Sequence, residues 1–111
     1  MDVQVTTEDV GVRTVLHVSG EIDVASADRL RERTTLLVAQ GRTDLVVDLT
    51  GVTFLDSTGL GLLVGTLKRV RTLGGDLVLV VDSERLLKVF RITGLTQVFD
   101  IRETVADALG S

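Results

Sequence analysis

The chain has 111 residues, a formal net charge of −4, no cysteine and only three aromatic residues, all of them phenylalanine. This length suits one domain, and the hydrophobic content of 44% suits a core built from valine, leucine and isoleucine. The lack of cysteine excludes disulfides and thiolate metal sites, and the acidic balance argues against binding to nucleic acid through its phosphates.

Neither a secretion signal nor a membrane span is visible in the sequence. The first ten residues, "MDVQVTTEDV", begin with an acidic residue and lack the apolar centre of a signal peptide. The longest wholly apolar runs, such as Leu77–Val81, fall far short of the roughly 20 residues that a spanning helix needs. We therefore expect a soluble cytoplasmic protein with no direct membrane or nucleic-acid partner.

The first third of the chain predicts an antiparallel hairpin and then a helix. Apolar and polar residues alternate at Val3 and Val5 and again over Val12–Ser19, on either side of a short turn that contains glycine. From Ala25 the spacing becomes helical, and Gly41 is typical of the residue that ends a helix.

Buried strands and helices alternate over the rest of the chain. Continuous apolar runs at Asp44–Leu49 and Asp76–Val81 are typical of strands covered on both faces. Helical spacing follows the first run as far as the Gly74-Gly75 pair, and a third helix is predicted over Ser83–Thr93.

The C-terminal part predicts a short strand near Val98–Ile101 and a last helix near Thr104–Leu109. The whole order predicts an α/β fold, because strands that alternate with helices pair in parallel through right-handed crossovers. We expect a small mixed sheet, with an N-terminal antiparallel hairpin followed by βαβ crossovers, packed with about four helices. Residues 1–111 are expected to form one domain.

A cluster of small polar residues, "LDSTGLG" at positions 55–61, lies between the predicted strand and helix in the middle of the chain. Ser57 is well placed to be a helix N-cap, whose hydroxyl accepts a hydrogen bond from a free amide of the first turn. Gly59 and Gly61 need a separate reason, because glycine inside a helix costs roughly 1 kcal/mol relative to alanine. For Gly61 and Gly65, which share one face, we expect tight packing of the helix on the sheet.

Several catalytic interpretations of this cluster fail on spacing. A phosphate-binding Walker loop needs a lysine that is missing between Gly51 and Gly65, and a hydrolase elbow needs glycine two residues before the serine, where Leu55 stands. The sequence "GLGLLVG" has one residue too many between its last two glycines for a dinucleotide-binding loop. The one histidine, His17, is expected to be a half-buried strand residue, so no base is available for catalysis at Ser57.

Ser57 remains as a substrate for another enzyme. A phosphoryl group would add roughly −1.5 to −2 charges, which free amides and the dipole at a helix N-terminus tolerate. Beside Asp56 and Asp23 it would concentrate negative charge at one edge of the surface, and like charges in an interface cost several kcal/mol. Such a modification would switch binding off while it leaves the fold unchanged.

Three segments, Ser19–Leu30, Leu45–Gly65 and Gly74–Leu95, closely resemble the STAS domain of bacterial anti-sigma factor antagonists. The most specific block is "FLDSTGLG", and "GEID" and "ITGL" stand in the matching places. The likeness covers nearly the whole chain. It implies the STAS-type fold and a partner-switching role in signal transduction, such as a stress response or sporulation.

The resemblance implies that Ser57 is the phosphate acceptor of an anti-sigma factor that is also a serine kinase. The unphosphorylated chain would bind that kinase and release a sigma factor, and a serine phosphatase would restore the phosphorylated form to the binding state. The chain would itself be no enzyme and would need no cofactor and no metal. Its partner-binding residues would be Asp23, Asp56, Thr58, Gly59, Leu60 and Gly61.

The two acidic residues also have purely structural roles open to them. Asp23 is equally typical of a helix N-cap, and Asp56 of a charge favoured by the helix dipole. The family resemblance leaves the pathway open as well, since similar domains act as scaffolds in stress signalling, as subunits of lipid-transport complexes and as parts of anion transporters. A chain of 111 residues argues only against the transporter fusion.

Overall fold

A computed structural model describes residues 3–110 as a sheet flanked by helices. The elements in chain order are β1 (Gln4–Val10), β2 (Arg13–Ile22), α1 (Ala27–Ala39), β3 (Asp44–Leu55), α2 (Ser57–Thr72), β4 (Asp76–Val80), α3 (Glu84–Ile92), the 3₁₀ turn η1 (Leu95–Gln97), β5 (Asp100–Arg102) and α4 (Val105–Gly110).

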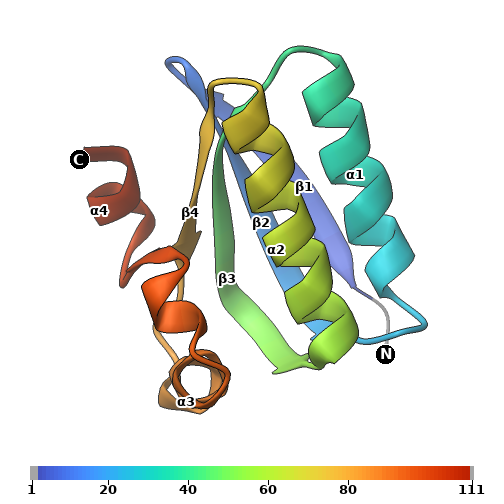
Figure 1. Ribbon diagram of the computed structural model, residues 1–111, viewed down its shortest axis with the longest axis vertical. Helices are drawn as coiled ribbons and strands as arrows, with labels where there is room; N and C mark the ends of the chain where they lie inside the picture. Colours follow the sequence, from blue (N-terminus) through green and yellow to red (C-terminus); the bar gives the residue numbers. More distant parts are fainter. Residues whose placement is uncertain (1–2, 111) are drawn as a thin grey trace.

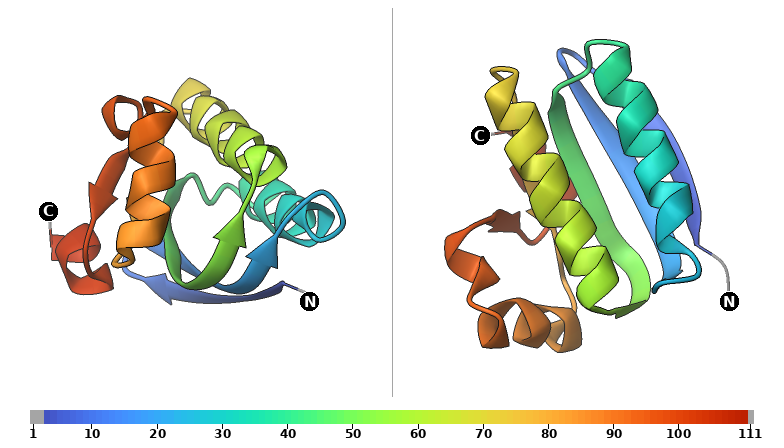
Figure 2. Two further views of the ribbon diagram at one scale, coloured as in Figure 1. Left: turned by 90° about the horizontal axis from the view of Figure 1, so that it is seen from below. Right: turned by 45° about the vertical axis from the view of Figure 1, so that its right-hand side comes forward.

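The strands follow one another across the sheet in sequence order, β1-β2-β3-β4-β5. β1 and β2 form an antiparallel hairpin, and each later strand pairs in parallel with the one before it. Right-handed crossovers that always step in the same direction place their helices on one face. Figures 1 and 2 show this arrangement, with α1 and α2 side by side over the sheet. The predicted mixed α/β fold is confirmed.

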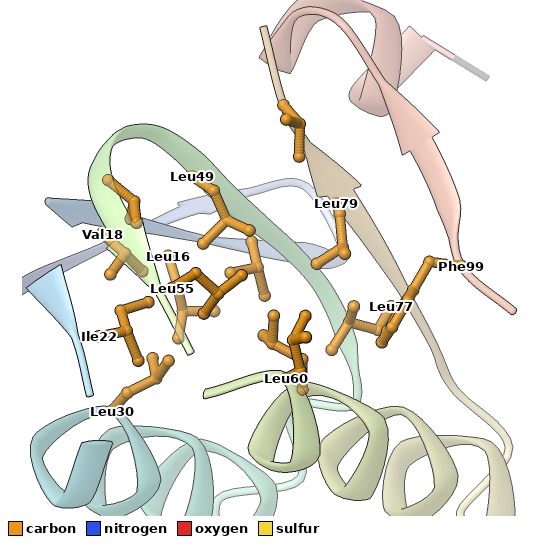
Figure 3. Packing of buried hydrophobic residues seen from close by; sticks show 14 of the residues in the cluster. Leu16, Val18, Ile22, Leu30, Leu49, Leu55, Leu60, Leu77, Leu79 and Phe99 are labelled. Atoms are coloured by element: carbon orange, nitrogen blue, oxygen red, sulfur yellow. The ribbon is translucent and has the colours of Figure 1, made fainter. Parts of the chain in front are cut away.

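The main hydrophobic core lies between this face and the crossover helices (Figure 3). Leu16, Ile22 and Leu79 of the strands are fully buried there, and Leu30 of α1 and Phe90 of α3 close the core from the helix side. The core contains no aromatic pair other than Phe90 and Phe99 among the described residues, which meet edge to face at a centroid distance of 6.0 Å.

The opposite face of the sheet is only partly covered. The short helix α4 places Ala108 against Val15, Val46 and Val80, in a second and smaller apolar cluster. Arg13 fastens α4 to β2, because its guanidinium donates to the carbonyl oxygen of Ala108. The remaining part of this face, over β1 and β2, carries polar side chains.

β3 is longer than the predicted strand Asp44–Leu49, because it continues to Leu55. β4 pairs with only the first five residues of β3, and the later ones pair with β2 alone. Two register shifts interrupt the pairing with β2, and each inserts one extra residue into β3. Polar exposed residues in this extension hid it from a search for continuous apolar runs.

Candidate functional site

The predicted site residues lie at the edge of the sheet where β2 and β3 end. Ile22 pairs with Leu55, and the amide of Asp56 donates to the carbonyl oxygen of Ile22 at 3.2 Å. Asp23 and Asp56, the next residues of the two strands, therefore leave the sheet side by side. Both α1 and α2 begin at this edge (Figure 1).

Asp56 is the N-cap of α2. Its Oδ1 accepts hydrogen bonds from the amides of Thr58 (2.9 Å) and Gly59 (3.2 Å), two of the donors that a helix start leaves unpaired. The prediction that Ser57 caps the helix is therefore wrong, because Ser57 is the first helical residue. Its side chain is exposed, and its hydroxyl has no partner among residues 3–110. The site thus offers a hydroxyl group that is open to a second protein.

Asp23 is held in a turn that leads into α1. Its Oδ1 accepts the amides of Ala25 and Ser26, both at 3.0 Å. The N-cap position of α1 is Ser26, so Asp23 is not the cap that the sequence allowed. The hydrogen bond with the Ser26 hydroxyl, followed by that with the Ser26 amide, lowers the pKa of Asp23 below its usual 3.8. Asp23 is accordingly a fixed negative charge at neutral pH.

Ser26 was missed by the sequence analysis. It is 5% exposed, and its hydroxyl donates to the carbonyl oxygen of Glu21 at 2.6 Å. Its Oγ also accepts the amide of Asp23 at 3.0 Å. The three-residue spacing from aspartate to serine just before a helix is the signal that would have found it. Ser26 orients Asp23 without being part of the surface.

Two of the predicted binding residues, Gly59 and Leu60, are buried. A Cβ atom on Gly59 would lie 2.4 Å from Leu55 Cδ1 and 2.7 Å from Ile22 Cγ2, so glycine lets the first turn of α2 approach the strand ends. Leu60 belongs to the main core and is labelled there in Figure 3. These residues pack the first turn of α2 against the strand ends and the core, and they do not line the surface of the site.

Thr58 and Gly61 face a groove between α1 and α2. The groove measures about 420 Å³ and begins at Ser57. A Cβ added to Gly61 or Gly65 would meet nothing within 4 Å. The expectation that this pair packs tightly on the sheet is therefore wrong, because both glycines point outward into the groove.

Exposed apolar side chains flank the acidic edge and were not anticipated. Val24 is 75% exposed directly after Asp23, and Phe54 is 48% exposed two residues before Asp56. Phe54 looks like a core residue in the sequence, but the register shift between Gly20 and Glu21 turns it outward. The edge thus combines two carboxylates and an exposed hydroxyl with exposed apolar side chains. Such a mixture of polar and apolar groups is typical of protein–protein interfaces.

His17 lies far from this edge, in the middle of β2, and it is half-buried as predicted. Its Nδ1 lies 2.8 Å from Asp48 Oδ2, and its Nε2 lies 3.2 Å from Glu8 Oε1. The hydrogen bond with Asp48, followed by that with Glu8, raises the pKa of His17 above 6.5. With both nitrogens engaged by carboxylates, this imidazole is not poised to act as a base.

Within residues 3–110, no set of three or more histidine, cysteine or carboxylate side chains is arranged to hold a metal ion. In that same part of the chain, the helices are too short or too polar to cross a bilayer.

The family model described as the STAS domain matches residues 3–108. An anti-sigma-B factor antagonist of Bacillus subtilis is 46% identical over 101 residues, which are 91% of this chain and 88% of that relative. The crystal structure of an anti-sigma factor antagonist from Mycobacterium paratuberculosis superposes with a TM-score of 0.83, at 33% identity, over 97% of this chain and 92% of the other.

A third comparison concerns the Bacillus cell fate determinant SpoIIAA in its phosphorylated form. That structure gives a TM-score of 0.75 at 25% identity, and the match covers 96% of this chain and 97% of the other. The family model and the likeness to these antagonists show that the chain belongs to the STAS domain family, in its group of anti-sigma factor antagonists.

Proposed function

We propose that this chain binds an anti-sigma factor while Ser57 is unmodified, and that phosphorylation of Ser57 ends the binding and so returns the sigma factor to its inhibitor. The single observation that carries the proposal is the exposed hydroxyl of Ser57 at the first position of α2, which has no hydrogen-bond partner in the described part of the chain. The anti-sigma factor itself acts as a serine kinase that transfers the γ-phosphoryl group of ATP to the Ser57 hydroxyl and leaves ADP, and a serine phosphatase later removes the group by hydrolysis. The chain catalyses nothing and works in the cytoplasm.

The fold tolerates a phosphate at Ser57 for electrostatic reasons. The N-terminal end of a helix carries roughly half a positive charge, which favours an anion there. The hydroxyl points to solvent, so the added oxygen atoms displace no core side chain. A SpoIIAA relative that was solved in a phosphorylated form has the same fold as this chain, which supports this part of the proposal.

The same phosphate opposes binding. It adds roughly −1.5 to −2 charges next to Asp56 and beside Asp23, which already is a fixed anion. A partner that docks on the unmodified edge would have to desolvate three negative groups instead of two. Like-charge contacts in an interface cost several kcal/mol, and about 3 kcal/mol already lowers affinity more than a hundredfold.

The test is to incubate the purified chain with ATP and the anti-sigma factor of its own organism, and to follow the intact mass. Wild type and Thr58→Ala are expected to gain one phosphate, and Ser57→Ala to gain none while it still binds the anti-sigma factor. Ser57→Asp is expected to fold and to bind at least about tenfold more weakly in calorimetry. Phosphate on Ser57→Ala, or unchanged affinity of Ser57→Asp, would contradict the proposal.

A further inference from the structure

The groove between α1 and α2 continues directly from Ser57 along the outer surface of the molecule. α2 forms one wall from Ser57 to Arg69, and α1 forms the other with Arg31 and Thr34. Twelve residues of helix separate Ser57 from Arg69, so the groove is about 18 Å long at 1.5 Å per residue. It is long enough to hold about three turns of a helix or five residues of extended chain.

The charged side chains that line the groove are both arginines, although the protein is acidic overall. Its described lining includes Arg31 near the Ser57 end and Arg69 at the far end, and no carboxylate. Asp28 pairs with Arg31 from outside the groove. The guanidinium of Arg69 donates only a long hydrogen bond, of 3.5 Å, to the Thr35 hydroxyl. This contrasts with the net charge of −4 of the whole chain.

The α2 wall of the groove is open because it contains two glycines, Gly61 and Gly65, that the packing of the fold does not need. A methyl group on Gly61 or Gly65 would contact no atom of this chain within 4 Å. Each glycine nevertheless costs α2 roughly 1 kcal/mol relative to alanine. Without side chains here, a second backbone can come close to α2.

We propose that this groove receives an acidic segment of the anti-sigma factor, with Arg31 and Arg69 binding its carboxylates and Gly61 and Gly65 admitting its backbone. The inference rests on the proposed function, and it extends the docking surface from the Ser57 edge along α2. Charge complementarity selects this occupant, since the groove has two cations and no anion along its described walls. A phosphate on Ser57 would compete with that segment at the Arg31 end alone, because Arg69 is too distant.

The experiment measures the affinity of the anti-sigma factor by calorimetry at low and at physiological ionic strength. Arg69→Gln is expected to weaken binding about fivefold and to reduce its dependence on salt. Lys68→Gln is the matched control. It removes the same charge from the neighbouring residue of α2, which is exposed and outside the groove, and it is expected to change affinity by less than about twofold.

A second variant tests whether the partner comes close to the α2 wall of the groove. Gly65→Ala is expected to raise the melting temperature, since it removes a helix penalty without a clash, and to weaken binding nevertheless. Opposite signs for stability and affinity cannot arise from damage to the fold. In a Ser57→Asp background, Arg31→Gln is expected to weaken binding less than it does in the wild type, and Arg69→Gln to weaken it equally in both.

The outcomes separate the two proposals. If Ser57→Asp weakens binding while Arg69→Gln does no more than Lys68→Gln, the groove inference is wrong and the phosphorylation switch stands. If Gly65→Ala binds as tightly as wild type, the partner does not enter the groove. If the wild type binds no anti-sigma factor, the proposed function fails, and the groove inference fails with it.

Discussion

Asp56 does two things at the start of α2 that a sequence cannot separate. It closes the first turn by accepting the amides of Thr58 and Gly59, and it places a negative charge next to Ser57. The cap sets the direction of the helix, and so fixes where the Ser57 hydroxyl points. The charge contributes to the repulsion on which the proposed switch depends.

Two substitutions at Asp56 separate these roles. Asp56→Ala is expected to lower the free energy of unfolding by about 1 kcal/mol, because it removes an N-cap. Asp56→Asn keeps an oxygen acceptor and loses the charge, so it is expected to retain most of the stability. Urea denaturation of both variants measures the difference. Equal losses for Asp56→Asn and Asp56→Ala would show that the charge, and not the cap, stabilises the helix.

At the scale of single residues, the sequence predicted which positions meet but not what each one does. Asp23, Asp56 and Ser57 were expected at one edge, and the structure brings them there. Aspartate and serine are almost equally good caps, however, so a shift of one residue exchanged their roles. Sequence spacing does not resolve a single residue at a helix boundary.

At the scale of elements, the first three turns of α2 contain glycines of two kinds. Gly59 lies against the ends of β2 and β3, where a methyl group has no room. Gly61 and Gly65 lie on the outer side, where a methyl group meets nothing. The apolar spacing of Leu60, Leu63 and Leu67 marks the buried side of this helix, and Gly61 and Gly65 lie off that side.

Alanine at Gly59 and at Gly65 is expected to have effects of opposite sign. Gly59→Ala forces Leu55 and Ile22 to move and is expected to destabilise the fold by about 1–3 kcal/mol. Gly65→Ala is expected to stabilise it by up to about 1 kcal/mol. Thermal unfolding of the two variants, with wild type as reference, checks both signs, and a stabilised Gly59→Ala would contradict the packing described for the first turn.

The elements themselves were largely predictable, and their ends were not. Continuous apolar runs identified β4 and the first half of β3, since both are buried on both faces. The last strand was expected near Val98–Ile101 but begins at Asp100, because the amides of Val98 and Phe99 donate to the carbonyl oxygen of Leu95 in the turn that follows η1. The extension of β3 escaped notice because only two of its six residues, Val52 and Leu55, are buried.

At the scale of the whole molecule, one face of the sheet is closed by helices and the other is half open. On the open half, His17 connects three strands by contacting Glu8 of β1 and Asp48 of β3. Burial alone would raise the pKa of Asp48, but hydrogen bonds from the Thr50 amide and His17 outweigh it and lower the pKa. The imidazole therefore lies between the carboxylates of Glu8 and Asp48, and both hydrogen bonds favour its protonated form by raising its pKa.

This arrangement predicts that stability falls as the pH rises above about 6.5. The pKa of His17 is higher in the folded chain than its ordinary value of 6.5, so its contribution is complete below pH 6.5 and is lost as the pH rises through the folded pKa. The loss should stay below about 1 kcal/mol, because the side chain is 38% exposed. Urea denaturation between neutral and alkaline pH measures it, with His17→Gln as the control that shows no such step.

The second half of β3 is hydrogen-bonded to β2 alone, so the sheet narrows to two strands before the chain reaches Ser57. β4 pairs with β3 only as far as Asp48, so no strand beyond β2 is hydrogen-bonded to the segment that leads to Ser57. Leu55, at the end of this two-stranded segment, is still buried in the main core, whereas Ser57, two residues later, is exposed. A charge added at Ser57 therefore lies outside the packed interior. The proposed switch therefore needs a change of charge at the surface and no rearrangement of the strands.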